Sequence, residues 1–344
     1  MSNLAHWMAN MIDDLITRLA AFLSAAAGAP AEIQEARPIA GGASRETWSV
    51  DAVVGGERLA LVLRMDQASS MNPDALTRPQ EFALLRSAYD HGVLVPRPRW
   101  LDAEGAALGR PLFVMDRVEG ESIGPRVVRR PELAAARARM PAQMAEQLAR
   151  IHAIDPAPLD FLPRPPDGRS PALHAVDSAR AAIDAIGLDS PALEFGLRWL
   201  ERHAPACPRP TLVHGDFRVG NLLVGPEGLR AVIDWEFAHV GDPHEDLAWA
   251  CVRDWRFGAD RLRVGGVGEL EPYLAAYEAA AGHAVDRAAL RYWEILGNLR
   301  WGAICHAQAQ RHLSGADPSV EYASLGRRAA EMELEFLTLI ESEG

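Results

Sequence analysis

One short segment of the sequence gathers the side chains that chemistry on phosphate requires. His214, Asp216 and Asn221 lie between two apolar runs, and Asp234 directly follows the apolar run Ala231-Val-Ile. Transfer of a phosphoryl group from magnesium-bound ATP needs a carboxylate that meets the acceptor hydroxyl, and hard oxygen ligands that hold the cation against the phosphates. An Asp followed five residues later by an Asn, with a second Asp beyond the next strand, could supply these groups.

Each of these side chains also has a purely structural interpretation. Asp216 could cap a turn, Asn221 could occupy a left-handed turn position, and Asp234 could be an exposed acidic residue. We favour the functional interpretation because the residues share one short segment whose flanking apolar runs would bury them. The chain also contains only five Asn, so an Asn at this position is less readily accidental.

The motif His214-Gly-Asp-x-x-x-x-Asn221, followed by Ile-Asp234-Trp, resembles the aminoglycoside phosphotransferase and choline kinase family, which has a protein-kinase-like fold. Two further segments are similar to that family, and the likeness spans Ile39 to Trp249: Gly241-Asp-Pro-His-Glu-Asp-Leu-Ala-Trp249, after the metal site, and Gln147-Leu-Ala-Arg-Ile-His-Ala-Ile-Asp155, at the end of a long helix. The residue types of the motif most resemble those of the phosphotransferase domains that are associated with acyl-CoA dehydrogenases.

The resemblance implies a kinase that uses ATP and Mg2+ and phosphorylates a hydroxyl group of a small molecule. Asp216 would be the catalytic carboxylate, Asn221 and Asp234 would be magnesium ligands, and His214 would be a buried positioning residue. The narrower likeness favours a hydroxyacyl-CoA or related metabolite as the acceptor. An aminoglycoside, a macrolide or an amino alcohol such as choline is the alternative.

Kinases of this fold normally hold the α and β phosphates with a Lys on the third strand, paired to a Glu on the following helix. This chain contains no Lys, since all 35 basic residues are Arg. Arg64 ends the third predicted strand and Glu81 stands on the helix after it, and an Arg can grip phosphate oxygens with two parallel hydrogen bonds. We therefore expect Arg64 and Glu81 to replace the usual pair. The alternative is that Arg64 is an ordinary arginine at a strand end and that the protein is a catalytically silent nucleotide-binding protein.

Arg218 follows Asp216 by two residues. We expect its guanidinium to neutralise charge that develops on the transferred γ-phosphoryl group. The alternative is a surface arginine paired with Glu236 or Asp242.

Two further segments are candidates for nucleotide contacts. Backbone N–H groups of Gly41 and Gly42, with the Ser44 hydroxyl, could cover the phosphates, although small residues in a hairpin turn explain the same pattern. The strand that contains Met115, in the hinge segment 113–118, resembles the one whose exposed backbone binds adenine in this family.

Other polar and aromatic clusters receive structural interpretations. We expect Asp246 to cap a helix and to brace a loop, and the basic run 126–139 to be a solvated helix face rather than a site for an anionic substrate. Three tryptophans of the C-terminal helices fit core packing: Trp255, Trp293 and Trp301.

A metal-dependent hydrolase is a further alternative, because histidines and carboxylates also bind zinc or manganese. It would use His214, Asp216, Asp234, His239 and His244. This alternative leaves unexplained why Asn221, and the pair of Arg64 with Glu81, stand where they do.

Composition narrows the class of protein. The formal charge of -12 disfavours binding to nucleic acid, and no stretch approaches the roughly 18 apolar residues of a membrane span. The three cysteines are far apart and the N-terminus does not read as a signal peptide, so we expect a reducing compartment, the cytoplasm. The sequence leaves the oligomeric state open.

The pattern of the 344 residues predicts an α+β, protein-kinase-like fold of two lobes. Residues 1–117 would form an N-terminal helix and a small antiparallel β-rich lobe that binds nucleotide. Residues 118–344 would form a larger, mostly helical lobe that carries the catalytic loop and the metal-binding segment. The hydrophobic pattern places three strands between Ile33 and Arg64, and three or four helices between Asp246 and Glu341.

Overall fold

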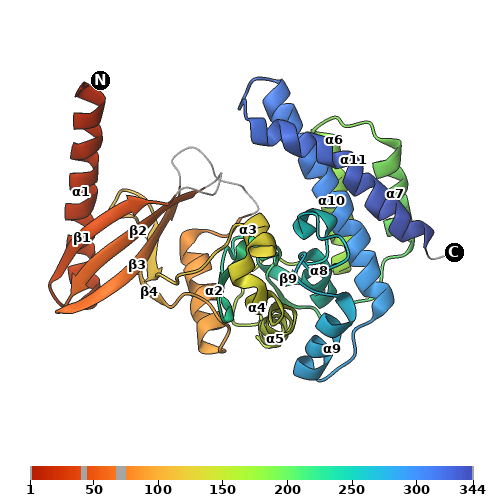
Figure 1. Cartoon of the computed structure of the whole chain (residues 1–344), viewed down its shortest axis with the longest axis horizontal. Coiled ribbons are helices and arrows are strands. Elements are labelled where there is room, and N and C mark those ends of the chain that lie inside the picture. The colour runs from red at the N-terminus through yellow and green to blue at the C-terminus, as the bar shows by residue number, and fades with distance from the viewer. Residues whose placement is uncertain (1, 40–44, 67–74, 343–344) are drawn as a thin grey trace. The chain divides into compact units, whose positions relative to one another are not determined.

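The computed structural model describes residues 2–39, 45–66 and 75–342 (Figure 1). The chain divides into two compact units, each made of two segments. The first unit contains Met1–Glu119 and Arg230–Phe237, and the second contains Gly120–Leu229 and Ala238–Gly344. Gly41, Gly42 and Ser44, expected to cover phosphates, lie outside the described residues.

The first unit is an antiparallel sheet with two helices. Its elements in chain order are α1 (Ser2–Ala27), β1 (Ala31–Pro38), β2 (Arg45–Val54), β3 (Glu57–Asp66), α2 (Arg78–Asp90), β4 (Pro98–Asp102) and β5 (Leu112–Asp116). The sheet has the order β1-β2-β3-β5-β4, so β3 is its central strand. The three antiparallel strands expected from the sequence are β1, β2 and β3.

Alternation along β3 decides which side chains enter the core. Leu61, Leu63 and Met65 lie in one apolar cluster with Leu19 and Leu23 of α1. Successive side chains of a strand point to opposite faces of the sheet. Arg64 is therefore on the face opposite this core.

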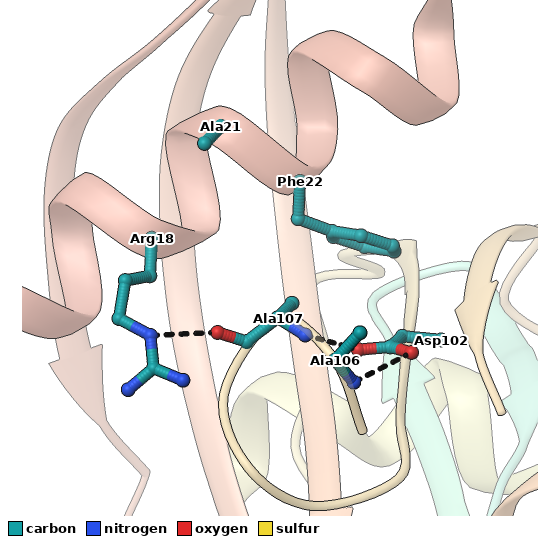
Figure 2. Close-up of a pocket in the computed structure, with 6 residues that line it drawn as sticks. All are labelled: Arg18, Ala21, Phe22, Asp102, Ala106 and Ala107. Atoms are coloured by element: carbon teal, nitrogen blue, oxygen red, sulfur yellow. Dashed lines mark hydrogen bonds between the residues drawn. The ribbon is translucent and has the colours of Figure 1, made fainter. Parts of the chain in front are cut away.

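A shallow pocket of the first unit lies between α1 and the loop after β4 (Figure 2). Arg18 of α1 donates from Nε to the backbone oxygen of Ala107 at 2.7 Å, while the Asp102 carboxylate accepts from the backbone N–H groups of Ala106 and Ala107 at 3.1 and 2.7 Å. These bonds hold the loop against the helix, so we assign the pocket a structural role.

The second unit is mainly helical. Its α-helices are α3 (Gly124–Arg129), α4 (Ala134–Arg137), α5 (Met140–Ala153), α6 (Pro171–Ala185), α7 (Pro191–Arg202), α8 (Pro243–Trp249), α9 (Leu270–Ala281), α10 (Arg287–Leu313) and α11 (Val320–Glu341). Helices α10 and α11 lie side by side (Figure 1). The short strands β6 (Thr211–Val213) and β9 (His239–Gly241) pair antiparallel. Strand β7 (Leu222–Gly225) is followed by β8 (Gly228–Val232), inside which the chain passes from the second unit to the first.

The architecture confirms the expected fold class, an antiparallel sheet region followed by a mostly helical region. One helix start was predicted wrongly, because α8 begins four residues earlier than the capping role of Asp246 requires. Asp242 is the N-cap and accepts a hydrogen bond from the His244 N–H at 2.9 Å, with Pro243 at the start of the helix, where proline has no N–H to leave unpaired. No helix among the described residues has the length and apolar character needed to cross a bilayer.

Candidate active site

The structure brings Arg64 and Glu81 together inside the first unit. Arg64 Nη1 is 2.9 Å from Glu81 Oε1, and Glu81 is fully buried. Position 64 pairs with Phe113 of β5 across the sheet, and α2 begins after Thr77, whose N–H donates to Gln80 Oε1 at 2.9 Å. The sheet register and this helix start place the two charged side chains opposite each other.

Arg78, a residue that the sequence analysis did not single out, shares Glu81 with Arg64. It has no exposed surface, it forms an ion pair with the second Glu81 oxygen, and its guanidinium lies 5.8 Å from the centre of the Phe113 ring. Removing one partner of a buried ion pair leaves the charge of the other partner uncompensated. Glu81 is therefore fixed from two sides and holds Arg64 in place.

Asp234 reaches Arg64 from a distant part of the sequence. Arg64 Nη2 donates to Asp234 Oδ1 at 3.0 Å, within the first unit to which Arg230–Phe237 belongs. Asp234 has φ of 68°, a left-handed backbone conformation that is uncommon outside glycine and concentrates at functional sites. Burial lowers the pKa of Arg64, but the negative charges of Glu81, Asp234 and Glu236 raise it by more. The pKa therefore lies above its usual value and the guanidinium stays charged.

Asp216 is the centre of a second cluster, inside the second unit. Its carboxylate accepts hydrogen bonds from Trp249 Nε1 at 2.7 Å, from Asn221 Nδ2 at 2.6 Å and from Arg218 Nε at 3.1 Å. Its side chain is 14% exposed. Three donors on one partly buried carboxylate restrict its orientation.

Asn221 and Arg218 are both bonded to this carboxylate. Asn221 Nδ2 also donates to the Asp216 backbone oxygen at 3.0 Å, so the amide nitrogen, and not the amide oxygen, faces Asp216. Arg218 pairs with Asp216 itself, and its guanidinium lies 4.7 Å from the centre of the Trp255 ring. The Arg218 side chain is 28% exposed, and its task at the transferred phosphoryl group stays a prediction.

His214 and Asp246 brace the loop that carries Asp216. The Asp246 carboxylate accepts from the backbone N–H groups of His214 and Gly215 at 2.7 and 3.0 Å, and lies 3.2 Å from His152 Nε2. His214 Nδ1 accepts from the Asp216 N–H at 3.2 Å. The bracing role expected of Asp246 is present, although the expected cap is not.

Met115 lies in β5, which is hydrogen-bonded to β3 on one side and β4 on the other. It pairs with Val62 and with Pro98. Just beyond it, the Asp116 N–H donates to the backbone oxygen of Arg97 at 2.9 Å, and the Arg117 N–H donates to the backbone oxygen of Ala60 at 2.8 Å. The adenine-binding role of this strand stays a prediction.

The histidines of the hydrolase alternative are bonded to neighbouring protein groups. His239 Nε2 is 3.2 Å from Glu245, and His244 bonds to Asp242 at 2.6 Å and to the Asp286 N–H at 3.2 Å. Among the residues that the structure describes, no three His, Cys, Asp or Glu side chains form a group that could hold a metal ion. His239 Nε2 and both ring nitrogens of His244 are therefore bonded to neighbouring protein groups.

Three comparisons with known proteins bear on this site. Residues 35–293 match the family model described as the phosphotransferase enzyme family. The chain belongs to this family. Its membership confirms the resemblance seen in the motif and the enzyme class expected from it.

Curated relatives confirm the narrower likeness as well. The chain is 30% identical over 200 residues to acyl-CoA dehydrogenase family member 10 of Mus musculus, and 27% identical over 327 residues to family member 11 of Gallus gallus. These matches cover 56% and 89% of this chain, but only 18% and 41% of the two relatives. The chain therefore spans less than half the length of the curated relatives it matches.

Solved structures share the fold. A putative aminoglycoside phosphotransferase from Ralstonia eutropha JMP134 matches with a TM-score of 0.75 and 20% identity, over 95% of this chain and 98% of that one. A spectinomycin phosphotransferase solved with ADP and spectinomycin matches with a TM-score of 0.62 and 14% identity, over 93% and 98%. Similarity at these identities establishes the protein-kinase-like architecture.

Trp249 and Trp255 are the site neighbours that sequence reasoning missed. Trp249 is the last residue of the family-like segment that begins at Gly241, so its place in a motif was the available signal. Trp255 was assigned to core packing. Its burial is consistent with that role, but its ring also contacts Arg218, in the loop that carries Asp216.

The ion pairs of Glu245 in α8 give a prediction about acid stability. Burial raises the pKa of Glu245, but His239 and Arg300 lower it more, to about 2 from the usual 4.5. A carboxyl with a depressed folded pKa contributes stability that is present above about pH 4.5 and is lost as pH falls toward 2. We expect Glu245→Gln to lower the free energy of unfolding by about 3 kcal/mol at pH 7, with a smaller difference from wild type at pH 3. Urea denaturation at both pH values measures this, and a difference that does not shrink on acidification contradicts the assignment.

Proposed function

We propose that this chain is a small-molecule kinase that transfers the γ-phosphoryl group of magnesium-bound ATP to a hydroxyl group. The observation that carries the proposal is the Asp216 carboxylate, held by Asn221 and Arg218 on one loop of a phosphotransferase family domain. Phosphoryl transfer depends mainly on positioning and charge neutralisation. A carboxylate restricted by several donors suits the task of orienting a hydroxyl group.

Asn221 and Asp234 are the proposed magnesium ligands. The amide oxygen of Asn221 is the end not occupied by Asp216, and Asp234 provides a carboxylate, so the donor set is made of the hard oxygens that Mg2+ prefers. When bound, the cation would neutralise phosphate charge. Asp234 Oδ1 accepts a hydrogen bond from Arg64 in this structure, which orients the carboxylate.

Arg64 is the proposed substitute for the missing lysine. Its Nη1 and Nη2 atoms are bonded to Glu81 and Asp234, while its Nε is buried without a hydrogen-bond partner among the described residues. A buried donor left unsatisfied costs about 1–3 kcal/mol. A phosphate oxygen could accept from this guanidinium, and Arg218 would neutralise charge on the transferred group.

A hydroxyacyl-CoA or related hydroxylated metabolite is the acceptor we favour. The support is the similarity to proteins named acyl-CoA dehydrogenase family members. An aminoglycoside or macrolide acceptor is the second candidate, since the spectinomycin phosphotransferase shares the fold and was solved with ADP and its antibiotic. The cytoplasmic location stays a prediction that the three unpaired cysteines fit.

A phosphorylation screen tests the proposal directly. The purified protein is incubated with magnesium and ATP together with hydroxyacyl-CoAs, aminoglycosides, macrolides and amino alcohols, and phosphorylated products are detected by mass spectrometry. A phosphorylated acceptor supports the proposal and names its class. A protein that binds ATP but phosphorylates no acceptor supports the catalytically silent alternative.

Thermal unfolding provides a test that needs no acceptor. A ligand that binds only the folded state at 100 times its dissociation constant stabilises the protein by about 2.7 kcal/mol. We expect magnesium with ATP to raise the melting temperature in a concentration-dependent manner. Magnesium with inorganic phosphate is the matched control, and an equal shift with both ligands contradicts a nucleotide site.

A further inference from the structure

We infer that Trp249 and Trp255 are positioning residues for the phosphoryl-transfer loop, which hold Asp216 and Arg218 in place from the side of α8 and the segment after it. The inference rests on the proposed function and concerns residues to which the sequence analysis gave no catalytic task. Both side chains are more than nine-tenths buried, at 6% and 4% exposure. Each makes one contact with the loop.

Trp249 acts on Asp216 through a directed hydrogen bond. Its indole Nε1 donates to Asp216 Oδ1 at 2.7 Å, a short distance for an N–H donor and one expected when the acceptor is charged. Of the three side chains bonded to this carboxylate, Arg218 and Asn221 have proposed tasks at the phosphate and the cation. The single polar group of Trp249, its indole N–H, already donates to Asp216. Trp249 can therefore hold the carboxylate while Arg218 and Asn221 bind the phosphate and the cation.

The indole of Trp249 is itself held in position. The guanidinium of Arg300 lies 5.5 Å from the ring centre, and Arg300 Nη1 is fixed by Glu245 at 2.8 Å. Helix α10 passes close by at Gly297, where an added Cβ would lie 2.9 Å from a Val252 methyl group and 3.4 Å from the Trp249 ring. The ring therefore has little freedom to move its N–H away from the carboxylate.

Trp255 acts on Arg218 through its ring face. The Arg218 guanidinium lies 4.7 Å from the ring centre, within the range of a cation–π contact. The indole N–H of Trp255 is buried and makes no hydrogen bond within the described part of the chain. Its contribution to the loop is therefore the aromatic face rather than a donor.

Trp255 has its own support from α10 and α11. Its ring centre lies 4.5 Å from that of Trp301, whose Nε1 donates to Asp254 at 2.6 Å. Arg328 of α11 is 2.7 Å from the same carboxylate. The C-terminal helices thus fix the surface on which Arg218 rests.

Substitutions that remove one feature at a time test the inference. Trp249→Phe keeps an aromatic ring but removes the donor to Asp216. We expect kcat to fall between about ten- and a hundredfold, the effect of losing a hydrogen bond to a charged group, while the KM for ATP changes less than about twofold. Trp255→Leu should lower kcat similarly, and Trp255→Phe should recover part of the loss because a ring face remains.

Trp293→Phe is the matched control. Trp293 is 2% exposed, and its indole N–H has no hydrogen-bond partner among the described residues, so this substitution removes the same atoms from a buried site without touching the loop. Equal kcat values for Trp249→Phe and Trp293→Phe would overturn the inference. If the wild-type protein phosphorylates no acceptor, the proposed function fails; if wild type is active and Asp216→Asn is inactive while Trp249→Phe is normal, only the inference fails.

A spectroscopic measurement tests the hydrogen bond from Trp249 to Asp216 without an activity assay and without substituting a tryptophan. The indole N–H signals in a nitrogen-15 correlation spectrum report the hydrogen bonds of the nine tryptophans. We expect one of these signals to move strongly between wild type and Asp216→Asn, because the charged acceptor of Trp249 is removed. Superimposable indole signals in the two proteins would show that the bond is not formed in solution.

Discussion

Asp216→Asn is expected to lower kcat by about 10²- to 10⁴-fold, the range typical of a group that handles the proton of a reacting hydroxyl. The substitution keeps the size of the side chain but removes its charge and one acceptor oxygen. Trp249, Arg218 and Asn221 each donate a hydrogen bond to that carboxylate. An amide has an oxygen that accepts and an NH2 group that only donates, so it cannot accept from all three donors in the same way. The acceptor hydroxyl would lose its partner and the loop would lose part of its order.

The affinity for ATP separates this effect from general damage. Asp216 has no proposed contact with the nucleotide, so the melting-temperature shift caused by magnesium with ATP should stay close to that of wild type. Asp317→Asn is the control, because the Asp317 carboxylate is about half exposed and forms an ion pair with Arg311 in the C-terminal part of the second unit. Retention of more than a tenth of wild-type kcat by Asp216→Asn would remove Asp216 from the catalytic role.

Arg64→Ala is expected to have the second large effect, a loss of at least about a hundredfold in kcat/KM for ATP. The substitution removes the guanidinium that bridges Glu81 and Asp234 at 2.9 and 3.0 Å. Loss of the phosphate contact and loss of order at Asp234 would act together, and each charged hydrogen bond is worth about 1.5–3 kcal/mol. Glu81 keeps Arg78 as a partner, so the first unit should still fold.

Arg64→Lys distinguishes the charge from the geometry of this side chain. A lysine has one compact ammonium and cannot reproduce the fork by which Arg64 reaches two carboxylates. We expect its activity to lie between those of wild type and Arg64→Ala. Arg58→Ala, an exposed arginine on the same strand, is the control. Steady-state kinetics with varied ATP measure all three variants. An unchanged KM and kcat in Arg64→Ala would support the alternative that Arg64 is an ordinary arginine at a strand end.

Local patterns in the sequence were enough to predict the elements around the site. The short apolar run from Leu59 to Leu63 predicts β3, and the helix after it places Glu81 within reach of Arg64, a separation of only seventeen residues. The motif from His214 to Asn221 predicts its own loop because its members are close in the chain. The start of α8 was predicted wrongly although Pro243, a residue typical of a helix start, was present in the sequence.

Contacts between distant segments were decided only by the tertiary structure. Arg64 and Asp234 are 170 residues apart, and nothing in the spacing of either motif shows that Arg230–Phe237 packs with the first unit. The hydrogen bond from Trp249 to Asp216 spans 33 residues and depends on where α8 ends. The sequence by itself thus determined the family, the order of the elements and the candidate residues for chemistry on phosphate, because these follow from short-range pattern and motif. Folding decided which charges meet and which tryptophans contact the loop, because those contacts depend on the packing of whole helices and strands.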